Sequence, residues 1–165
     1  MNKTEKYFGD YCDFLLYALR RNEPKNPSIK KMIRTFVREA THHAGAGYGY
    51  DPKKAATLVS AAAKQQILAG DLTGLVGEHV VTVSAICAMV MELVNPTKED
   101  LAATIRKWTL IAVITKAEDA RLKALKLNKT MPDNWETDML LRYKLAGIAT
   151  CAESYMDVYK ASKVK

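Results

Sequence analysis

Two short segments carry the residue types that acid–base or metal chemistry requires. Glu78 and His79 stand side by side at the start of an apolar run. Farther along, Glu118 and Asp119 follow an apolar, β-branched stretch at 109–114. Imidazole is a common general base near neutral pH and a common metal ligand, so a fold that joins these segments predicts a metal or acid–base site. Ordinary packing of His79 and helix capping by Glu118 explain the same residues, and the sequence leaves both interpretations open.

The elements that must position these residues are mostly helical. Apolar residues at helical spacing predict helices over 4–21, 28–43, 52–69, 80–94, 98–107, 116–127 and 139–162. Two capping boxes, Thr97 with Asp100 and Thr115 with Glu118, support two of the helix starts. Strong β composition is confined to 109–114. We therefore expect a mainly α fold, a single globular helical domain over 1–165 that forms a bundle of about six helices, with room for one short β-hairpin.

Composition narrows the class of protein. A chain of 165 residues with 48% hydrophobic and 26% charged residues fits one soluble domain. The longest apolar run, 80–94, is interrupted by polar residues and is too short to span a bilayer, so we expect no membrane partner. The three cysteines have no zinc-ligand spacing, which favours a reduced, cytoplasmic protein. The first ten residues lack the apolar core of a secretory signal.

Basic residues concentrate in one part of the chain. The formal net charge is +7, and seven basic residues lie between Arg20 and Arg38 against the single acidic residue Glu23. Such a surface attracts phosphates or acidic proteins, although a merely solvated helix face has the same composition. A glycine-rich loop, 44–50, follows this helix and offers a tyrosine on which a base can stack. The predicted nucleic-acid-binding residues are Lys30, Lys31, Arg34, Arg38, His42, His43 and Tyr48.

Two stretches together resemble the HNH, or ββα-metal, nucleases. Glu78-His79-Val80-Val81 is similar to the family's D/E-H-I/V-x-P string, with Thr82 where proline is usual. Ile111 to Leu122 (IAVITKAEDARL) is similar to I-x-V-x-T-x-x-x-H-x-x-L, with Asp119 in the place of the metal-binding His. The resemblance implies His79, Glu78 and Asp119 as catalytic residues, with His79 activating water. It also implies a divalent ion, Mg²⁺ or Mn²⁺, at His79 and Asp119. A degenerate, non-catalytic descendant fits the same residues.

A second, shorter pattern lies in the basic helix. Arg38 and His43 match the Arg-x4-His spacing of HEPN-type ribonucleases, which are also helical bundles. The resemblance implies metal-free cleavage of RNA, in which the ribose 2′-OH attacks the phosphodiester.

Two classes of function follow. The first is a small basic protein directed at DNA or RNA, either a nuclease with an HNH-like centre or a binding protein that has lost it. The second is a non-enzymatic binding or inhibitor protein whose basic helical face captures an acidic protein. Both classes are compatible with a homo-oligomer.

Overall fold

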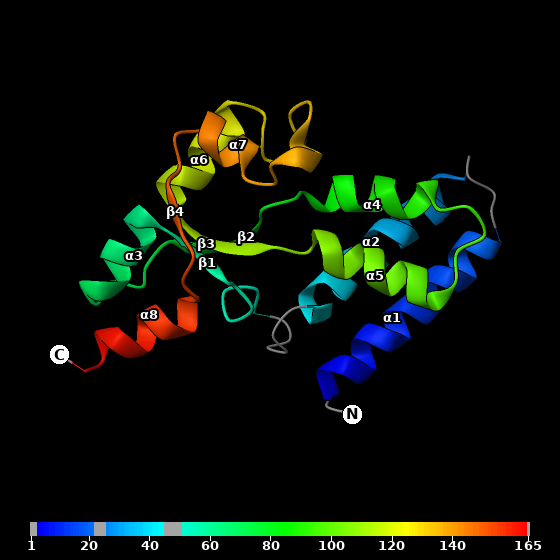
Figure 1. Ribbon diagram of the computed structural model, residues 1–165, viewed down its shortest axis with the longest axis horizontal. Helices are drawn as coiled ribbons and strands as arrows, with labels where there is room; N and C mark the ends of the chain where they lie inside the picture. The colour runs from blue at the N-terminus through cyan, green and yellow to red at the C-terminus, as the bar shows by residue number, and fades with distance from the viewer. Residues whose placement is uncertain (1–2, 22–25, 45–50, 165) are drawn as a thin grey trace. The chain divides into compact units, whose positions relative to one another are not determined.

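The computed structural model describes residues 3–21, 26–44 and 51–164. These residues divide into two compact units, each built from two stretches of chain. Unit 1 comprises 1–50 and 83–109, and unit 2 comprises 51–82 and 110–165. The mainly α expectation is confirmed, because the described part of the chain holds eight α-helices and a small four-stranded sheet (Figure 1). The expectation of one domain over 1–165 concerns how the units associate and stays a prediction.

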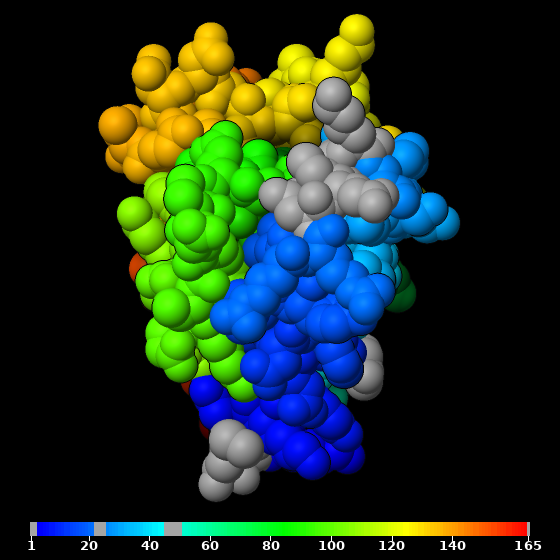
Figure 2. Space-filling view, turned by 90° about the vertical axis from the view of Figure 1, so that its right-hand side faces the viewer, coloured from blue at the N-terminus to red at the C-terminus, as the bar shows by residue number. Residues whose placement is uncertain are grey.

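Unit 1 is a bundle of helices. Its elements are α1 (Lys3–Arg20), α2 (Pro27–Ala44), α4 (Val83–Glu92) and α5 (Lys98–Trp108). Asn26 begins α2, because its Oδ1 accepts the backbone N–H of Ser28 and Pro27 occupies the first helical position. The predicted capping box of Thr97 and Asp100 begins α5. In Figure 2 the dark-blue surface of α1 runs beside the green surface of α5, two helices that are in contact.

The interior of unit 1 is built from apolar side chains at helical spacing. Each of the four helices contributes buried residues: Phe8, Cys12 and Leu15 from α1, Ile33 and Val37 from α2, Ile86 and Val90 from α4, and Leu101 and Ile105 from α5. Salt bridges tie α5 to α1 at the surface, with Lys98 on Asp13 and Arg106 on Glu5. The sequence pattern therefore predicted these helices well, since one face of each is apolar.

Unit 2 is a small sheet with helices on both faces. Its strands are β1 (Leu58–Ser60), β2 (Leu75–His79), β3 (Ile111–Thr115) and β4 (Thr150–Cys151), in the order β2-β3-β1-β4. Its helices are α3 (Ala61–Leu68), α6 (Lys116–Ala124), α7 (Leu141–Leu145) and α8 (Tyr155–Ser162), with a 3₁₀ turn at Trp135–Thr137. β3 pairs in parallel with β1 and antiparallel with β2, whereas β4 pairs antiparallel with β1.

Each face of this sheet has its own core. Val113 and Ile111 pack with Ile67 of α3 and Val158 of α8. On the other face, Ala112 and Ile114 pack with Leu122 of α6 and Tyr143 of α7. The sheet therefore separates α3 and α8 from α6 and α7, as the ribbon in Figure 1 shows.

Four expectations differ from the structure. The helix expected at 52–69 is a turn followed by β1 and α3, and the helix expected at 139–162 is α7, β4 and α8. The connection expected at 71–77, between two helices, instead runs into β2 at 75–79. The hairpin is replaced by β2 and β3, which are antiparallel neighbours although α4 and α5 lie between them in the chain. Pairing within the sheet explains these differences, because it selects extended backbone for short segments whose own composition is ambiguous: β1 and β2 pair with β3, and β4 pairs with β1.

No described helix combines the length and the apolar composition that crossing a bilayer demands. The three cysteines, Cys12, Cys87 and Cys151, are free.

Candidate functional site

Glu78 and His79 lie on opposite faces of the sheet. Successive residues of a strand point to opposite sides, and directly paired residues share a side. Glu78 pairs with Ala112, on the face that α6 and α7 cover. His79 pairs with Ile111, on the face that α3 and α8 cover. Only Glu78 is therefore directed toward α6, the helix that carries Asp119.

The carboxylate of Glu78 is held by two residues of α7. Nη2 of Arg142 donates to Oε2 of Glu78 and to the carbonyl of His79. The hydroxyl of Tyr143 donates to the same carboxylate oxygen at 2.7 Å. Arg142 has no exposed surface, and its remaining donors reach the carbonyls of Val80 at 2.6 Å and Leu127 at 2.7 Å. The buried Arg142 and the partly buried Glu78 thus form an ion pair in which each nitrogen of the guanidinium has an acceptor.

The proton on Tyr143 is held firmly. Burial raises the pKa of Tyr143 far above its usual range, and the adjacent negative charge of Glu78 raises it further. Tyr143 therefore stays a hydrogen-bond donor at any physiological pH. Both partners of Glu78 donate hydrogen bonds to it, so the arrangement gives this carboxylate a structural role.

Asp119 and Glu118 have different surroundings on α6. Asp119 pairs with Lys123, one turn farther along the helix. Glu118 is 4% exposed and is the third residue of α6, where it completes the capping box that Thr115 begins. The capping explanation of Glu118 is thus confirmed, and Asp119 has an ordinary i,i+4 partner.

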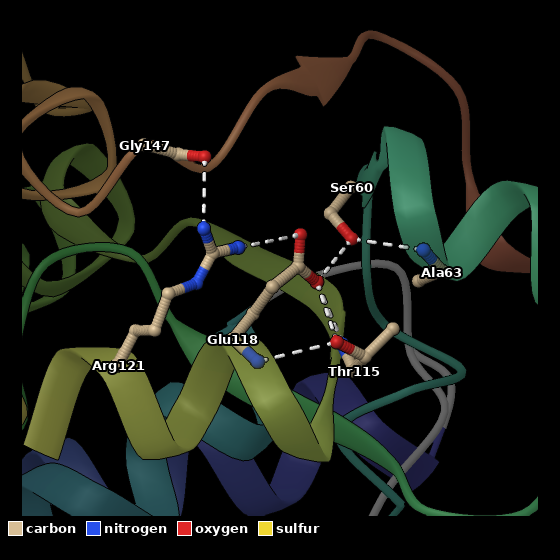
Figure 3. A network of polar contacts seen from close by, with 6 residues as sticks. All are labelled: Ser60, Ala63, Thr115, Glu118, Arg121 and Gly147. Carbon is tan, nitrogen blue, oxygen red and sulfur yellow. Dashed lines mark hydrogen bonds and ion pairs between the residues drawn. The ribbon is translucent and has the colours of Figure 1, made fainter.

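Glu118 also joins two strands (Figure 3). Its Oε2 accepts the hydroxyl of Ser60 at 2.6 Å and the backbone N–H of Thr115 at 2.8 Å. Ser60 in turn accepts the backbone N–H of Ala63 at 3.0 Å and so caps α3. On the outer side, Arg121 approaches Oε1 at 3.8 Å and donates to the carbonyl of Gly147 at 3.5 Å. One carboxylate therefore connects the N-termini of two helices.

This network occupies a position with a known role in open α/β sheets. β1 and β3 are parallel, and each is followed directly by a helix. The two helices cover opposite faces, α3 one and α6 the other. Ligands of open α/β sheets usually bind outside the carboxyl ends of two such strands. Here the side chain of Glu118 supplies the negative charge that two helix N-termini favour, so the position is filled by the protein itself.

The structure does not bring His79 and Asp119, the two metal ligands that the resemblance implies, to one face of the sheet. His79 and the helix of Asp119 lie on opposite faces of the β2–β3 pair. Glu78 and Asp119 each pair with a basic side chain, Arg142 and Lys123. In the part of the chain that the structure describes, no three His, Cys, Asp or Glu side chains cluster closely enough to hold an ion.

The basic residues of α2 form an exposed face. Lys30, Lys31, Arg34 and Arg38 are all exposed. Glu39 is the acidic residue of this helix, and it pairs with Arg38 at 3.1 Å. Within the described ranges, no salt bridge engages Lys30, Lys31 or Arg34. These three cations are therefore available to a partner.

The histidines of α2 are less available than the sequence predicted. His43 is 3% exposed and packs between α1 and α2, stacked on Tyr11 with ring centroids 5.7 Å apart. His42 is half-buried and lies 3.8 Å from a carboxylate oxygen of Glu39. Burial lowers the pKa of both histidines, and the charge of Glu39 opposes that shift. His43 is thus a neutral packing residue rather than a surface contact for nucleic acid. The predicted contact Tyr48 lies outside the described residues.

Arg38 and His43 do not share a site. Five helical positions correspond to a rotation of about 500°, so the two side chains leave the helix about 140° apart. Arg38 is exposed and His43 is buried. The spacing on which the ribonuclease resemblance rests therefore separates the two residues on α2.

Sequence reasoning missed Arg142, Tyr143 and Ser60. A signal for the first two was present, because an arginine within the apolar segment 139–148 must find a partner when that segment is buried. Ser60 had no comparable signal, since its role as a cap depends on a strand of three residues.

Comparison with protein-family models, with curated proteins and with solved structures finds no match to this chain.

Proposed function

We propose that this protein binds nucleic acid through the basic face of α2, and that the sheet of unit 2 acts as a scaffold. The observation that carries the proposal is the exposure of Lys30, Lys31 and Arg34 on one helix, without an internal carboxylate partner among the described residues. Phosphate contacts from lysine and arginine supply most of the affinity in sequence-independent binding. DNA and RNA are equally compatible with this chemistry.

The spacing of the cations suits a repeating anion. Lys30, Arg34 and Arg38 follow one another at four-residue intervals, which corresponds to a rise of about 6 Å per interval along a helix. Arg38 adds less net charge than the other two, because Glu39 is beside it. Other basic residues of unit 1, such as Lys98 and Arg106, are already paired with carboxylates of α1.

Binding to labelled single- and double-stranded DNA and RNA, measured over a range of salt concentrations, tests the proposal. We expect retention at low salt, and its loss in the triple variant Lys30→Glu, Arg34→Glu, Arg38→Glu. The matched control reverses three exposed lysines of unit 2, Lys54, Lys129 and Lys160, and so changes the net charge equally. Binding that is absent at low salt, or that the control weakens as much as the α2 variant, contradicts the proposal.

A metal-dependent nuclease of the ββα type is the second candidate. The observation that favours it is the arrangement of two antiparallel strands and a helix, since β2 pairs with β3, and β3 is followed directly by α6, whose Leu122 packs on the pair. The ion would be Mg²⁺ or Mn²⁺, and His79 would activate water. The separation of His79 from Asp119 places this candidate behind simple binding.

Cleavage assays separate these candidates. The binding proposal expects retention without cleavage in Mg²⁺, in Mn²⁺ and in EDTA. Metal-dependent cleavage that His79→Ala abolishes, with the fold intact, would support the nuclease instead. Cleavage that persists in EDTA would indicate a metal-free reaction of the kind that the ribonuclease resemblance of Arg38 and His43 implies, and it would contradict both candidates. An acidic protein is the alternative partner for the same face, and it is favoured if neither retention nor cleavage is observed.

A further inference from the structure

A pocket of about 280 Å³ lies in unit 1, where the ends of three helices meet. Its apolar lining comes from the end of α1, the first half of α2 and the residues that end α4: Leu19, Ile29, Ile33, Met91, Leu93 and Pro96. Pockets for drug-sized ligands usually enclose about 300–1,000 Å³. This one is smaller, so its size suits a single large apolar side chain better than a cofactor.

The charged residues that line this pocket are both basic. Arg20 and Lys30 contribute to the lining, and no carboxylate does so among the residues described. Arg34, one turn beyond Lys30, is exposed as well. A ligand with an apolar group and a negative charge beside it therefore complements both the apolar lining and the positive charge of the pocket.

Apolar surface continues beyond the pocket. Met91 lines the pocket and is 44% exposed, while Val94, close by in the chain, is 88% exposed. Methionine adapts its shape to different apolar partners, which is why it is frequent at peptide-binding surfaces. Because apolar surface extends outside the cavity, a chain that crosses the pocket covers more of it than a small molecule does. The aliphatic lining also lacks the aromatic rings on which nucleobases stack.

We propose that this pocket binds an acidic peptide segment of a partner protein. A large apolar side chain of the segment fills the cavity between Ile33 and Met91, and carboxylates on either side of it pair with Arg20 and Lys30. This binding does not depend on the proposed function, although Lys30 belongs to both surfaces. A bound acidic segment therefore competes with nucleic acid for Lys30.

The test uses a fluorescein-labelled synthetic peptide in which aspartates and glutamates flank a leucine and a tryptophan. Two control peptides replace either the apolar pair with serines or the acidic residues with lysines. We expect the first peptide to bind at least about tenfold more tightly than either control, because both the anchor and the charge are needed. Fluorescence anisotropy with the full chain gives the affinities.

Variants of the protein locate the site. Met91→Ser and Lys30→Glu are expected to weaken peptide binding by about fivefold or more. Two control variants, Leu145→Ser and Lys129→Glu, change exposed residues of unit 2 and are expected to leave it unchanged. Equal binding of the serine peptide, or no binding of the acidic apolar peptide, overturns the proposal. An oligonucleotide whose affinity falls on Met91→Ser as far as the peptide's does would assign the pocket to nucleic acid and also overturn it.

Discussion

The buried arginine of unit 2 and the exposed cations of α2 in unit 1 have opposite surroundings. In unit 2, Arg142 is fully buried and its donors reach one carboxylate and three carbonyl oxygens. In unit 1, Lys30 and Arg34 are exposed, and no salt bridge engages them within the described ranges. Removing a buried charge from its partner is costly, whereas an exposed charge contributes little to stability. The difference teaches that the charge buried in unit 2 serves the fold, and that the exposed charge on α2 is available for binding.

The carboxylates show the same contrast. Glu78 and Glu118 of unit 2 each accept hydrogen bonds from neighbouring elements, and Glu118 joins the starts of α3 and α6. In α2 of unit 1, the single acidic residue Glu39 lies beside Arg38 and cannot neutralise the whole face. The carboxylates of unit 2, which suggest catalysis in the sequence, are therefore structural. The basic residues of α2 in unit 1, which suggest a solvated helix face, carry the proposed function.

The largest expected effect comes from breaking the buried pair. Arg142→Leu removes the charged partner of Glu78, which keeps the hydroxyl of Tyr143, and it removes the Arg142 donors from the carbonyls of Val80 and Leu127; we expect a loss of about 3–5 kcal/mol in the free energy of unfolding. Urea unfolding followed by circular dichroism measures it. Lys123→Ala removes the exposed partner of Asp119 and is expected to change little. Equal effects of Arg142→Leu and Lys123→Ala would contradict the structural role of Glu78.

A smaller effect is expected at Gly77, where β2 meets another segment of unit 2. A Cβ at this position would lie 2.8 Å from the backbone nitrogen of Lys53 and 3.0 Å from the carbonyl carbon of Pro52. Backbone cannot move aside as a flexible side chain does, so Gly77→Ala is expected to cost about 1–3 kcal/mol. The control is Gly9→Ala in unit 1, whose Cβ would meet only the Lys98 side chain at 3.5 Å. Thermal unfolding midpoints compare the two, and equal midpoints would contradict a tight contact at Gly77.

Acid is expected to lower the stability of the protein through His43. Burial lowers the pKa of His43 below its ordinary value of 6.5, so the unfolded chain takes up this proton at a higher pH than the folded protein. The free energy of unfolding should therefore fall as the pH drops through 6.5, and this histidine should add no slope well above it. We expect His43→Phe to reduce the slope between about pH 7.5 and 5.5, measured by urea unfolding. An unchanged slope in a folded variant would show that His43 is not responsible.

The smallest effect on stability is expected when a single exposed charge of α2 is removed. The same change should have a clear effect on the salt dependence of nucleic-acid binding. Lys30→Gln removes one exposed charge of α2 and should leave the unfolding midpoint unchanged. If Lys30 contacts a phosphate, the slope of log affinity against log salt concentration should decrease in magnitude by about 1. Nucleic-acid binding isotherms at several salt concentrations measure that slope, with Lys54→Gln in unit 2 as the control. An identical slope in both variants would remove Lys30 from the phosphate contacts.

Elements with strong local signals could be predicted from the sequence. The apolar stripes of α1, α2 and α5, the β-branched strand β3 and the capping boxes of α5 and α6 all occur where local pattern places them. Two local signals interrupt the apolar segment 139–162: Gly147, with φ of 62°, and Ser154, which caps α8. The helical spacing of the apolar residues around them nevertheless predicted one continuous helix.

What the sequence by itself determined about this protein is the helical character of unit 1 and the basic charge of α2, because both depend on residues close together in the chain. Only the tertiary structure decided that β1, β2 and β4 are strands, since their pairing with segments far along the chain outweighs their weak local preference. It also decided that Glu78 faces Arg142 while His79 faces away, because a strand alternates its side chains between two faces and only the helices packed there give each face its chemistry.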